Sequence, residues 1–149
     1  MTDINNSDLR EQLELALGEQ LNALISEAHA LNVRTAATFE PTLQPAAFLI
    51  VRWLFSHGPT NATTLAESTA MDRSSISRLI KQLKSLGYVK SEPHPKDRRG
   101  VLLSLTELGY DKTTKALKEK ETAFYEKISS LTDLELKAYI EMLKFLTAQ

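Results

Sequence analysis

The most informative part of the sequence is residues 62–106, which read ATTLAESTAMDRSSISRLIKQLKSLGYVKSEPHPKDRRGVLLSLT. Capping and spacing patterns predict a short helix over residues 64–69 and a second helix over residues 73–86, joined by a tight turn. Two strand-like segments follow at residues 88–92 and 101–105, and the prolines and glycine between them predict a β-hairpin. The expected order is therefore helix, turn, helix and hairpin.

The ends of these two helices have recognisable signals. Thr64 and Glu67 match a capping box, in which a hydroxyl and a carboxylate accept hydrogen bonds from backbone amides at the start of a helix. Asp72 is expected to cap the second helix in a similar way, and Gly87 to end it. Residues 61–63 are interpreted as a short strand that precedes the first helix.

The second helix has an apolar face and a polar face. Its apolar residues at helical spacing are expected to be buried: Ile76, Leu79, Ile80 and Leu83. The opposite face carries short hydroxyls and long cations: Ser74, Ser77, Arg78, Lys81 and Ser85. The major groove of DNA is wide enough to admit one helix, and small serines would let it approach closely. A helix, a turn, a second helix and a hairpin then form a winged helix-turn-helix.

Positive charge is concentrated in this part of the chain. The net charge is only −1, yet residues 73–99 hold eight basic side chains against Glu92 and Asp97. The eight are Arg73, Arg78, Lys81, Lys84, Lys90, Lys96, Arg98 and Arg99. A nearly neutral protein with one basic patch suits a polyanionic partner, although a basic segment can also be an ordinary solvated face.

The tip of the hairpin is also basic. Lys96, Arg98 and Arg99 crowd a turn that contains only Asp97 to offset them. An arginine on a projecting turn can enter the minor groove, where the potential is most negative. Asp97 is expected to orient a neighbouring arginine through a charge-assisted hydrogen bond. The alternative is a mobile, solvated turn.

Helices are predicted on both sides of this segment. Residues 8–31 place leucines and an alanine on one stripe, and a helix of this length would span about 36 Å at ~1.5 Å per residue. Residues 32–43 are interpreted as a polar connection. Residues 45–56 form an apolar helix that begins at Pro45 and is ended by Gly58.

Two more helices are predicted after the hairpin. One begins after Thr106 and runs to about Ser129, and the other begins at the capping box Thr132-x-x-Glu135 and runs to the end of the chain. The long helices carry more apolar surface than one small winged lobe can cover. We therefore expect two chains to pair, with residues 8–31 and 110–149 as dimerisation helices.

Several other classes are disfavoured. The chain has no cysteine, which excludes disulfides and thiol redox chemistry. The histidines, His29, His57 and His94, match neither metal-ligand nor catalytic-triad spacing, so no metal, no cofactor and no catalytic residue is expected. The longest apolar run, residues 48–55, contains Arg52 and is too short to span a bilayer. With no signal-peptide pattern at the start, we expect a cytoplasmic protein without a membrane partner.

The segment resembles the MarR family of bacterial transcription regulators. The resemblance rests on Leu65-Ala66-Glu67, on the run from Asp72 to Ile80, on Leu86-Gly87-Tyr88-Val89, and on Asp97-Arg98-Arg99 leading to Ser104-Leu105-Thr106. The acidic residue and arginines of the turn, followed by a strand that ends in Leu-Thr, are its most specific part. The motifs cover about residues 44–109, and outside them the resemblance depends on helix order alone.

The resemblance implies a homodimer with interlaced terminal helices and one winged lobe on each side. It also implies that Arg99 enters the minor groove and that Asp97 orients it. The DNA-binding residues expected from the pattern and the resemblance together are Arg73, Ser74, Ser75, Ser77, Arg78, Lys81, Lys96, Asp97, Arg98 and Arg99. Two lobes on a two-fold axis would bind a near-palindromic operator with half-sites about one helical turn apart.

A small effector is a further expectation. Many relatives release DNA when a small, often aromatic or anionic, molecule binds between the two regions. The candidates here are His29, Phe48, Arg52 and Trp53, which lie on the first two predicted helices. An arginine within an apolar helix is unusual, so Arg52 is the candidate partner for an anionic effector. Arg52 could equally pair with an acid or extend to the surface.

The sequence therefore predicts a mainly α protein with a small β-hairpin wing. The whole of residues 1–149 is expected to be one protomer, with a winged helix-turn-helix lobe at residues 44–109. The expected function is sequence-specific binding of duplex DNA by a homodimeric repressor. The alternative is a winged-helix module that binds another protein, although such a module would be expected to expose apolar side chains on its second helix.

Overall fold

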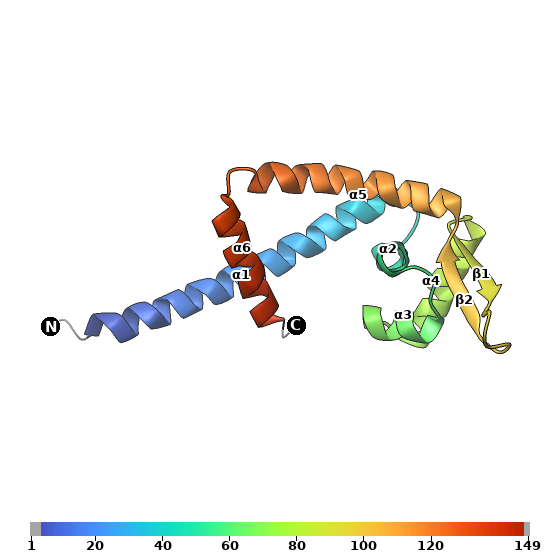
Figure 1. The fold of residues 1–149 in the computed structure, drawn as a ribbon, viewed down its shortest axis with the longest axis horizontal. Coiled ribbons are helices and arrows are strands. Elements are labelled where there is room, and N and C mark those ends of the chain that lie inside the picture. The colour runs from blue at the N-terminus through green and yellow to red at the C-terminus, as the bar shows by residue number, and fades with distance from the viewer. Residues whose placement is uncertain (1–3, 148–149) are drawn as a thin grey trace. The chain divides into compact units, whose positions relative to one another are not determined.

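The computed structural model describes residues 4–147. Its elements are α1 (Ile4–Phe39), α2 (Pro45–His57), α3 (Ala62–Thr69), α4 (Arg73–Ser85), β1 (Val89–Pro93), β2 (Val101–Leu105), α5 (Glu107–Ile128) and α6 (Asp133–Leu146) (Figure 1). The predicted class, mainly α with one small hairpin, is confirmed. The last helix ends at Leu146, and residues 148–149 of its predicted course lie outside the described residues.

The chain divides into two compact units, residues 1–116 and 117–149. The first unit contains a winged-helix lobe made of α2, α3, α4 and the hairpin (Figure 1). In the hairpin, β1 pairs antiparallel with β2, from Val89 opposite Leu105 to Pro93 opposite Val101. Thr60 adds a single bridge to Leu103, with hydrogen bonds of 3.0 and 2.7 Å between their backbones. The prediction of a strand at residues 61–63 is therefore wrong, because Thr60 pairs with the hairpin and residues 61–63 do not.

The capping box expected at Thr64 is also wrong. Helix α3 begins earlier, at Ala62, and the Asn61 side chain accepts the backbone N–H of Thr64 at 2.8 Å. Asparagine is as good an N-cap as threonine or better, and Thr60 is held in the bridge just before it. The helix therefore starts where the chain leaves the sheet.

The predicted features of α4 are confirmed. The Asp72 carboxylate accepts the backbone N–H of Ser75 at 2.7 Å, and this hydrogen bond is the main reason why the pKa of Asp72 is lowered. The helix ends before Gly87, whose φ of 81° is in the left-handed region that glycine adopts without steric cost. All four predicted apolar residues of the helix are buried: Ile76, Leu79, Ile80 and Leu83.

The prediction of a polar connection over residues 32–43 is wrong for most of that range. Helix α1 continues to Phe39 because residues 32–39 contain neither proline nor glycine, and Pro41 is the first residue that blocks it. Burial of side chains against the lobe also favours helical structure in these added turns. Thr35, Ala36 and Phe39 are buried against the lobe, and the Phe39 ring lies 5.6 Å from that of Phe48 in α2.

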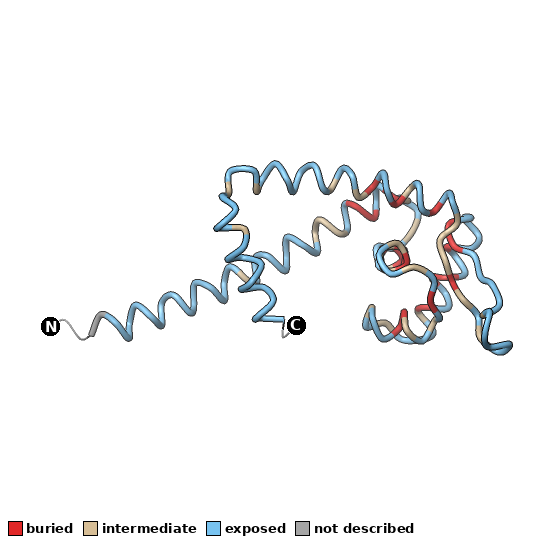
Figure 2. Tube along the Cα trace, viewed as in Figure 1, coloured by how far each residue is buried: buried red, intermediate tan, exposed pale blue. Residues whose placement is uncertain are grey.

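Burial is uneven along α1. Its C-terminal end is buried, whereas the residues before it are largely exposed (Figure 2). Four leucines of the predicted stripe are between 43% and 58% exposed: Leu9, Leu13, Leu17 and Leu24. The single chain thus leaves this apolar stripe uncovered.

The second unit consists of the last part of α5 and helix α6. Thr132 and Glu135 form the predicted capping box, with Thr132 Oγ1 accepting the Glu135 amide at 3.1 Å. No residue of α6 is buried among those described, and its large apolar residues other than the half-buried Leu136 are between 41% and 84% exposed. The apolar side chains of α6 are therefore available for contacts that one copy of the unit does not make.

A polar cluster joins α1, the root of the hairpin and α5 within the first unit. The buried Tyr88 hydroxyl donates a hydrogen bond to Glu40 at 2.5 Å and accepts one from Lys112 Nζ at 2.9 Å. The hydrogen bond to Tyr88 is the main reason why the pKa of Glu40 is lowered and that of Lys112 is raised. Gly109 lets the helix pass close to Tyr88, since a Cβ there would lie 2.2 Å from the Tyr88 carbonyl oxygen.

Replacing Tyr88 with phenylalanine should lower the melting temperature at pH 7 by a few degrees, because the ring stays against Phe39 but both hydrogen bonds are lost. The lowered pKa of Glu40 means that its contribution is present above about pH 4.3 and is lost as the pH falls through its pKa in the fold. The raised pKa of Lys112 means that its contribution is present up to about pH 10.4 and is lost above it.

The difference in melting temperature between wild type and Tyr88→Phe should therefore be largest near neutral pH and smaller at pH 3. Circular dichroism across this range measures it, with Tyr110→Phe, an exposed tyrosine of α5, as the matched control. A difference that stays constant from pH 3 to pH 7 would contradict the assigned role of Glu40.

Candidate nucleic-acid interface

The polar face of α4 points away from the lobe because its apolar face is buried. Ser74, Ser77, Arg78 and Lys81 are all exposed. The ion pairs seen among the described residues include Arg10–Glu14, Arg34–Glu27, Lys90–Glu92 and Lys112–Glu40, and none of these includes a cation of α4. The helix therefore presents uncompensated positive charge beside small hydroxyl side chains.

Two of the predicted DNA-binding residues have partners within the lobe. The Arg73 guanidinium donates a hydrogen bond to Thr63 Oγ1 and so links the starts of α3 and α4. Ser75 Oγ donates to the Asp72 carboxylate at 3.0 Å as part of the helix cap. Both residues hold the turn between the helices, so their side chains are less free to contact DNA than Arg78 or Lys81.

The four predicted residues of the wing tip, Lys96, Asp97, Arg98 and Arg99, are exposed. Asp97 does contact Arg99, but its carboxylate accepts the Arg99 backbone N–H at 3.0 Å. Among the residues that the structure describes, no ion pair joins Asp97 to an arginine side chain. Asp97 thus makes a charge-assisted hydrogen bond to a neighbouring arginine, as the sequence predicts, and the atom it contacts is the backbone nitrogen of Arg99.

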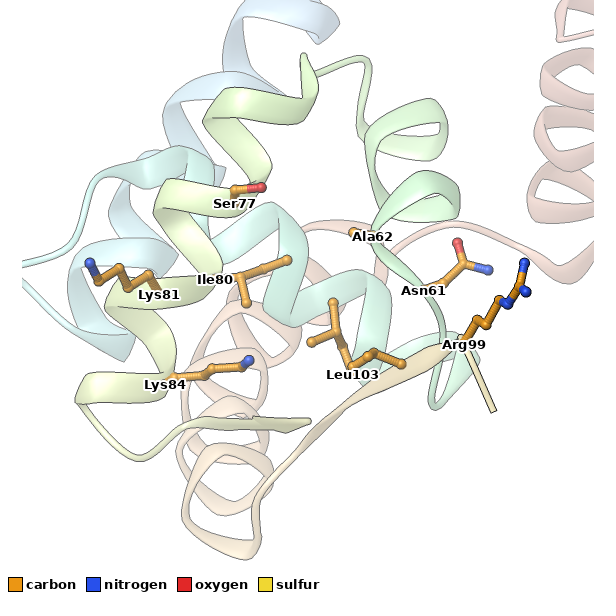
Figure 3. Close-up of a pocket in the computed structure, with 9 residues that line it drawn as sticks. Asn61, Ala62, Ser77, Ile80, Lys81, Lys84, Arg99 and Leu103 are labelled. Carbon is orange, nitrogen blue, oxygen red and sulfur yellow. The ribbon is translucent and has the colours of Figure 1, made fainter. Parts of the chain in front are cut away.

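A groove of about 490 Å³ lies between α4 and the hairpin. It is lined by Asn61, Ala62, Ser77, Ile80, Lys81, Lys84, Arg99, Val101 and Leu103. Lys84 extends from α4 toward Leu103 of β2, and Arg99 lies at the wing side of the groove (Figure 3). The groove therefore combines an apolar floor with cations contributed by both the helix and the wing.

Lys84 and Asn61 are absent from the predicted contact set. Lys84 follows Lys81 by three positions, so helical spacing alone could have placed it on the same side. Asn61 could not be found in this way, because its position depends on the true start of α3. Its side-chain oxygen is used for capping, which leaves the amide NH₂ as a donor at the groove.

A second pocket, of about 310 Å³, lies beside α2 and α3. It is lined by Leu49, Arg52, Trp53, Ser56, His57, Ser68 and Thr69. Arg52 Nη1 is buried without a hydrogen-bond partner among the described residues. The Trp53 and His57 rings stack with 4.3 Å between centroids. An unpaired guanidinium nitrogen beside stacked rings suits an aromatic anion.

The structure brings together only part of the predicted effector set. Arg52 and Trp53 line the second pocket, but Phe48 is buried against Phe39 and does not. His29 is exposed on α1 and does not line this pocket. The predicted effector set did not include His57, which lines this pocket and lies one helical turn after Trp53.

Other kinds of site are not found in residues 4–147. These residues contain no cluster of three or more histidine, cysteine or acidic side chains that could hold a metal ion. None of the helices in that range is long and apolar enough to cross a membrane.

Comparisons with known proteins agree with this architecture. The MarR family model matches residues 43–101. The transcriptional repressor NicR of Pseudomonas putida is 33% identical over 96 residues, which are 61% of this chain and 59% of NicR. The alignment thus spans less than two thirds of that relative's own length.

Solved structures show the same fold at lower sequence identity. The apo form of MarR from E. coli has a TM-score of 0.68 and 21% identity, over 87% of this chain and 96% of that one. Bordetella bronchiseptica BpsR, whose DNA binding is described as regulated by 6-hydroxynicotinic acid, has a TM-score of 0.60 and 22% identity. That match covers 86% of this chain and 98% of BpsR.

Proposed function

The winged-helix lobe of this chain belongs to the MarR family, and on this premise we propose that the protein is a transcription regulator that binds duplex DNA in a sequence-specific way. The observation that supports this most is the groove between α4 and the hairpin, which Lys81, Lys84 and Arg99 line. These cations come from two elements and have no acidic partners among the described residues.

The proposed binding mode assigns a different part of DNA to each element. Helix α4 enters the major groove, where Ser77, Arg78 and Lys81 reach base edges or phosphates. The wing places Arg99 in the adjacent minor groove. The sugar-phosphate backbone between the two grooves then lies over the space beside Lys84 and Asn61. Contacts with the sugar-phosphate backbone position the protein and carry no information about the base sequence.

A matched pair of lysine variants tests this mode. Lys84→Gln should weaken binding similarly for different DNA sequences and reduce the slope of log K against log[salt] by about one, because one phosphate contact is lost. Lys90→Gln makes the same charge change on β1, where Lys90 pairs with Glu92, and should leave the slope unchanged. Fluorescence anisotropy with a labelled duplex at several salt concentrations measures both.

Arg78→Ala and Arg99→Ala should each weaken binding of the preferred duplex by about 5- to 150-fold, in line with the 1–3 kcal/mol of a good base contact. Circular dichroism confirms that each variant is folded. If all these variants bind DNA as the wild type does, the alternative of a winged-helix module that binds another protein is favoured. The face of α4 argues against that alternative, because its exposed residues are serines and cations.

We further propose that the protein acts as a homodimer on a near-palindromic operator. The uncovered leucine stripe of α1 and the exposed apolar residues of α6 support pairing. Stable obligate dimers bury more than roughly 2,000 Å² in total. Two paired lobes would bind half-sites about 34–36 Å apart. Action as a repressor is proposed because NicR is named a repressor.

The dimer proposal predicts opposite results for two substitutions on the same helix. Leu24→Glu places a charge in the middle of the stripe and should convert a micromolar dimer into monomers, which analytical ultracentrifugation would detect. Leu15→Glu makes the same change at an exposed leucine on the opposite side of α1 and should leave the dimer intact. A wild-type protein that sediments as a monomer would contradict the proposal directly.

We propose that an aromatic carboxylic acid binds in the pocket beside Arg52 and weakens DNA binding. The Arg52 guanidinium, whose Nη1 atom has no hydrogen-bond partner among the described residues, supplies the charge, and Trp53 and His57 supply stacking surfaces. Regulation of BpsR by 6-hydroxynicotinic acid supports this ligand class. The remaining predicted candidates, His29 and Phe48, do not line this pocket.

The ligand proposal predicts a rise in melting temperature with 6-hydroxynicotinic acid or benzoate, since a ligand at 100 times its Kd adds about 2.7 kcal/mol of stability. Arg52→Gln should abolish the rise. Arg34→Gln removes an exposed arginine that pairs with Glu27 and should preserve it. Equal shifts in both variants would place the ligand elsewhere.

A further inference from the structure

The tip of the wing is organised around one histidine. His94 Nδ1 accepts the backbone N–H groups of Lys96 at 3.0 Å and of Asp97 at 3.1 Å. The backbone N–H of His94 donates to the Gly100 carbonyl at 2.9 Å, and that of Gly100 donates to the Asp97 carbonyl at 3.0 Å. The imidazole therefore supplies the acceptor for two consecutive amides inside a closed turn.

The sequence around His94 explains why a side chain has to provide this acceptor. Pro93 and Pro95 have no N–H group and so donate no hydrogen bond on either side of His94. A residue before proline is also disfavoured from helical backbone. The amides that follow would otherwise depend on water.

The turn is closed tightly on its other side. A Cβ at Gly100 would lie 3.1 Å from the Cβ of His94, closer than ordinary van der Waals contact. Asp97 adds the hydrogen bond from its carboxylate to the Arg99 backbone N–H. The backbone is thus held by His94 at residues 96 and 97 and by Asp97 at residues 99 and 100, on both sides of Arg98.

The two hydrogen bonds require one state of the ring. An acceptor at Nδ1 means that this nitrogen carries no proton, so the neutral ring has its proton on Nε2. An imidazolium has protons on both nitrogens and can accept neither amide. Protonation of His94 would therefore release the amides of Lys96 and Asp97.

We propose that His94 is a positioning residue for DNA binding: as a neutral imidazole it orders the backbone that presents Lys96, Arg98 and Arg99. This rests on the proposed function, because it assigns the wing tip to DNA. An ordered tip binds more tightly than a mobile one, since less conformational entropy is lost in the complex. His94 acts through its neighbours and needs no contact with DNA of its own.

Protonation has two opposing effects at this position. The charged groups of the hairpin around His94 are Lys96, Arg98 and Arg99 with Asp97 in the turn, and Lys90 with Glu92 on β1. A charged imidazole would add attraction to phosphates but would be repelled by the three cations of the turn. We expect the loss of two hydrogen bonds to outweigh the added attraction, which an exposed, salt-screened charge makes small.

Two substitutions separate ordering from charge. In His94→Asn the side-chain oxygen replaces Nδ1 at the same distance from the backbone, accepts hydrogen bonds and does not titrate. In His94→Ala the acceptor is lost. At pH 8 the Asn variant should bind a labelled duplex, recovered by the wild type from a random pool, about as well as wild type. The Ala variant should bind it about three- to tenfold more weakly, as expected for hydrogen bonds at a partly exposed turn.

The pH profile is the readout that simple destabilisation would not change. Because only the neutral ring can accept the two amides, wild-type affinity should fall relative to His94→Asn as the pH is lowered from 8 into the acid range. His29→Asn, at an exposed histidine of α1 that lines neither pocket, should keep the wild-type profile. Parallel profiles for wild type and His94→Asn, or equal binding by His94→Ala and wild type at pH 8, would overturn the proposal.

A measurement without DNA distinguishes failure of this proposal from failure of the proposed function. In the free protein, NMR should show the Nε2-protonated tautomer of His94 and slow exchange of the Lys96 and Asp97 amides at neutral pH. Both features should be lost when the ring is protonated in acid, and the amide protection should be absent in His94→Ala. If the wild type recovers no duplex, the DNA-binding function fails, whereas unprotected amides at neutral pH would overturn the role of His94 alone.

Discussion

Burial of one face of α4 is the constraint on which the rest of the lobe depends. Ile76, Leu79 and Leu83 are inaccessible to solvent or nearly so, and removing a buried leucine or isoleucine typically costs 2–5 kcal/mol. A helix that must bury this face has no freedom to rotate about its axis. The serines and cations of the opposite face are therefore directed outward by hydrophobic packing, and no polar interaction with the lobe is needed to place them.

Features that depend on local patterns could be predicted from the sequence, and features that depend on tertiary contacts could not. The Asp72 cap, the buried face of α4, the hairpin and the Thr132 capping box follow from residues a few positions apart. The start of α3 depends on the bridge between Thr60 and Leu103, which joins residues distant in sequence. The end of α1 depends on the burial of Phe39 against the lobe, where the local pattern had indicated a connection.

The candidate interface shows the same division. Helical spacing identified Arg78 and Lys81 on the polar face of α4, and the basic turn identified the wing. The groove that includes Lys84 and Asn61 is formed by three separate elements, so periodicity within one element could not reveal it. The burial of Arg52 Nη1 likewise depends on how α2 and α3 pack together. The unusual arginine was visible in the sequence, but its lack of a partner was not.

The cluster around Tyr88 has a consequence for movement within the first unit. Tyr88 directly precedes β1 and follows the glycine that ends α4, while Glu40 directly follows α1. A tilt of α1 must therefore either pull the base of the wing with it or separate a charged pair and two hydrogen bonds. The Tyr88 side chain therefore couples the long helix to the base of the wing, so a displacement of one is transmitted to the other.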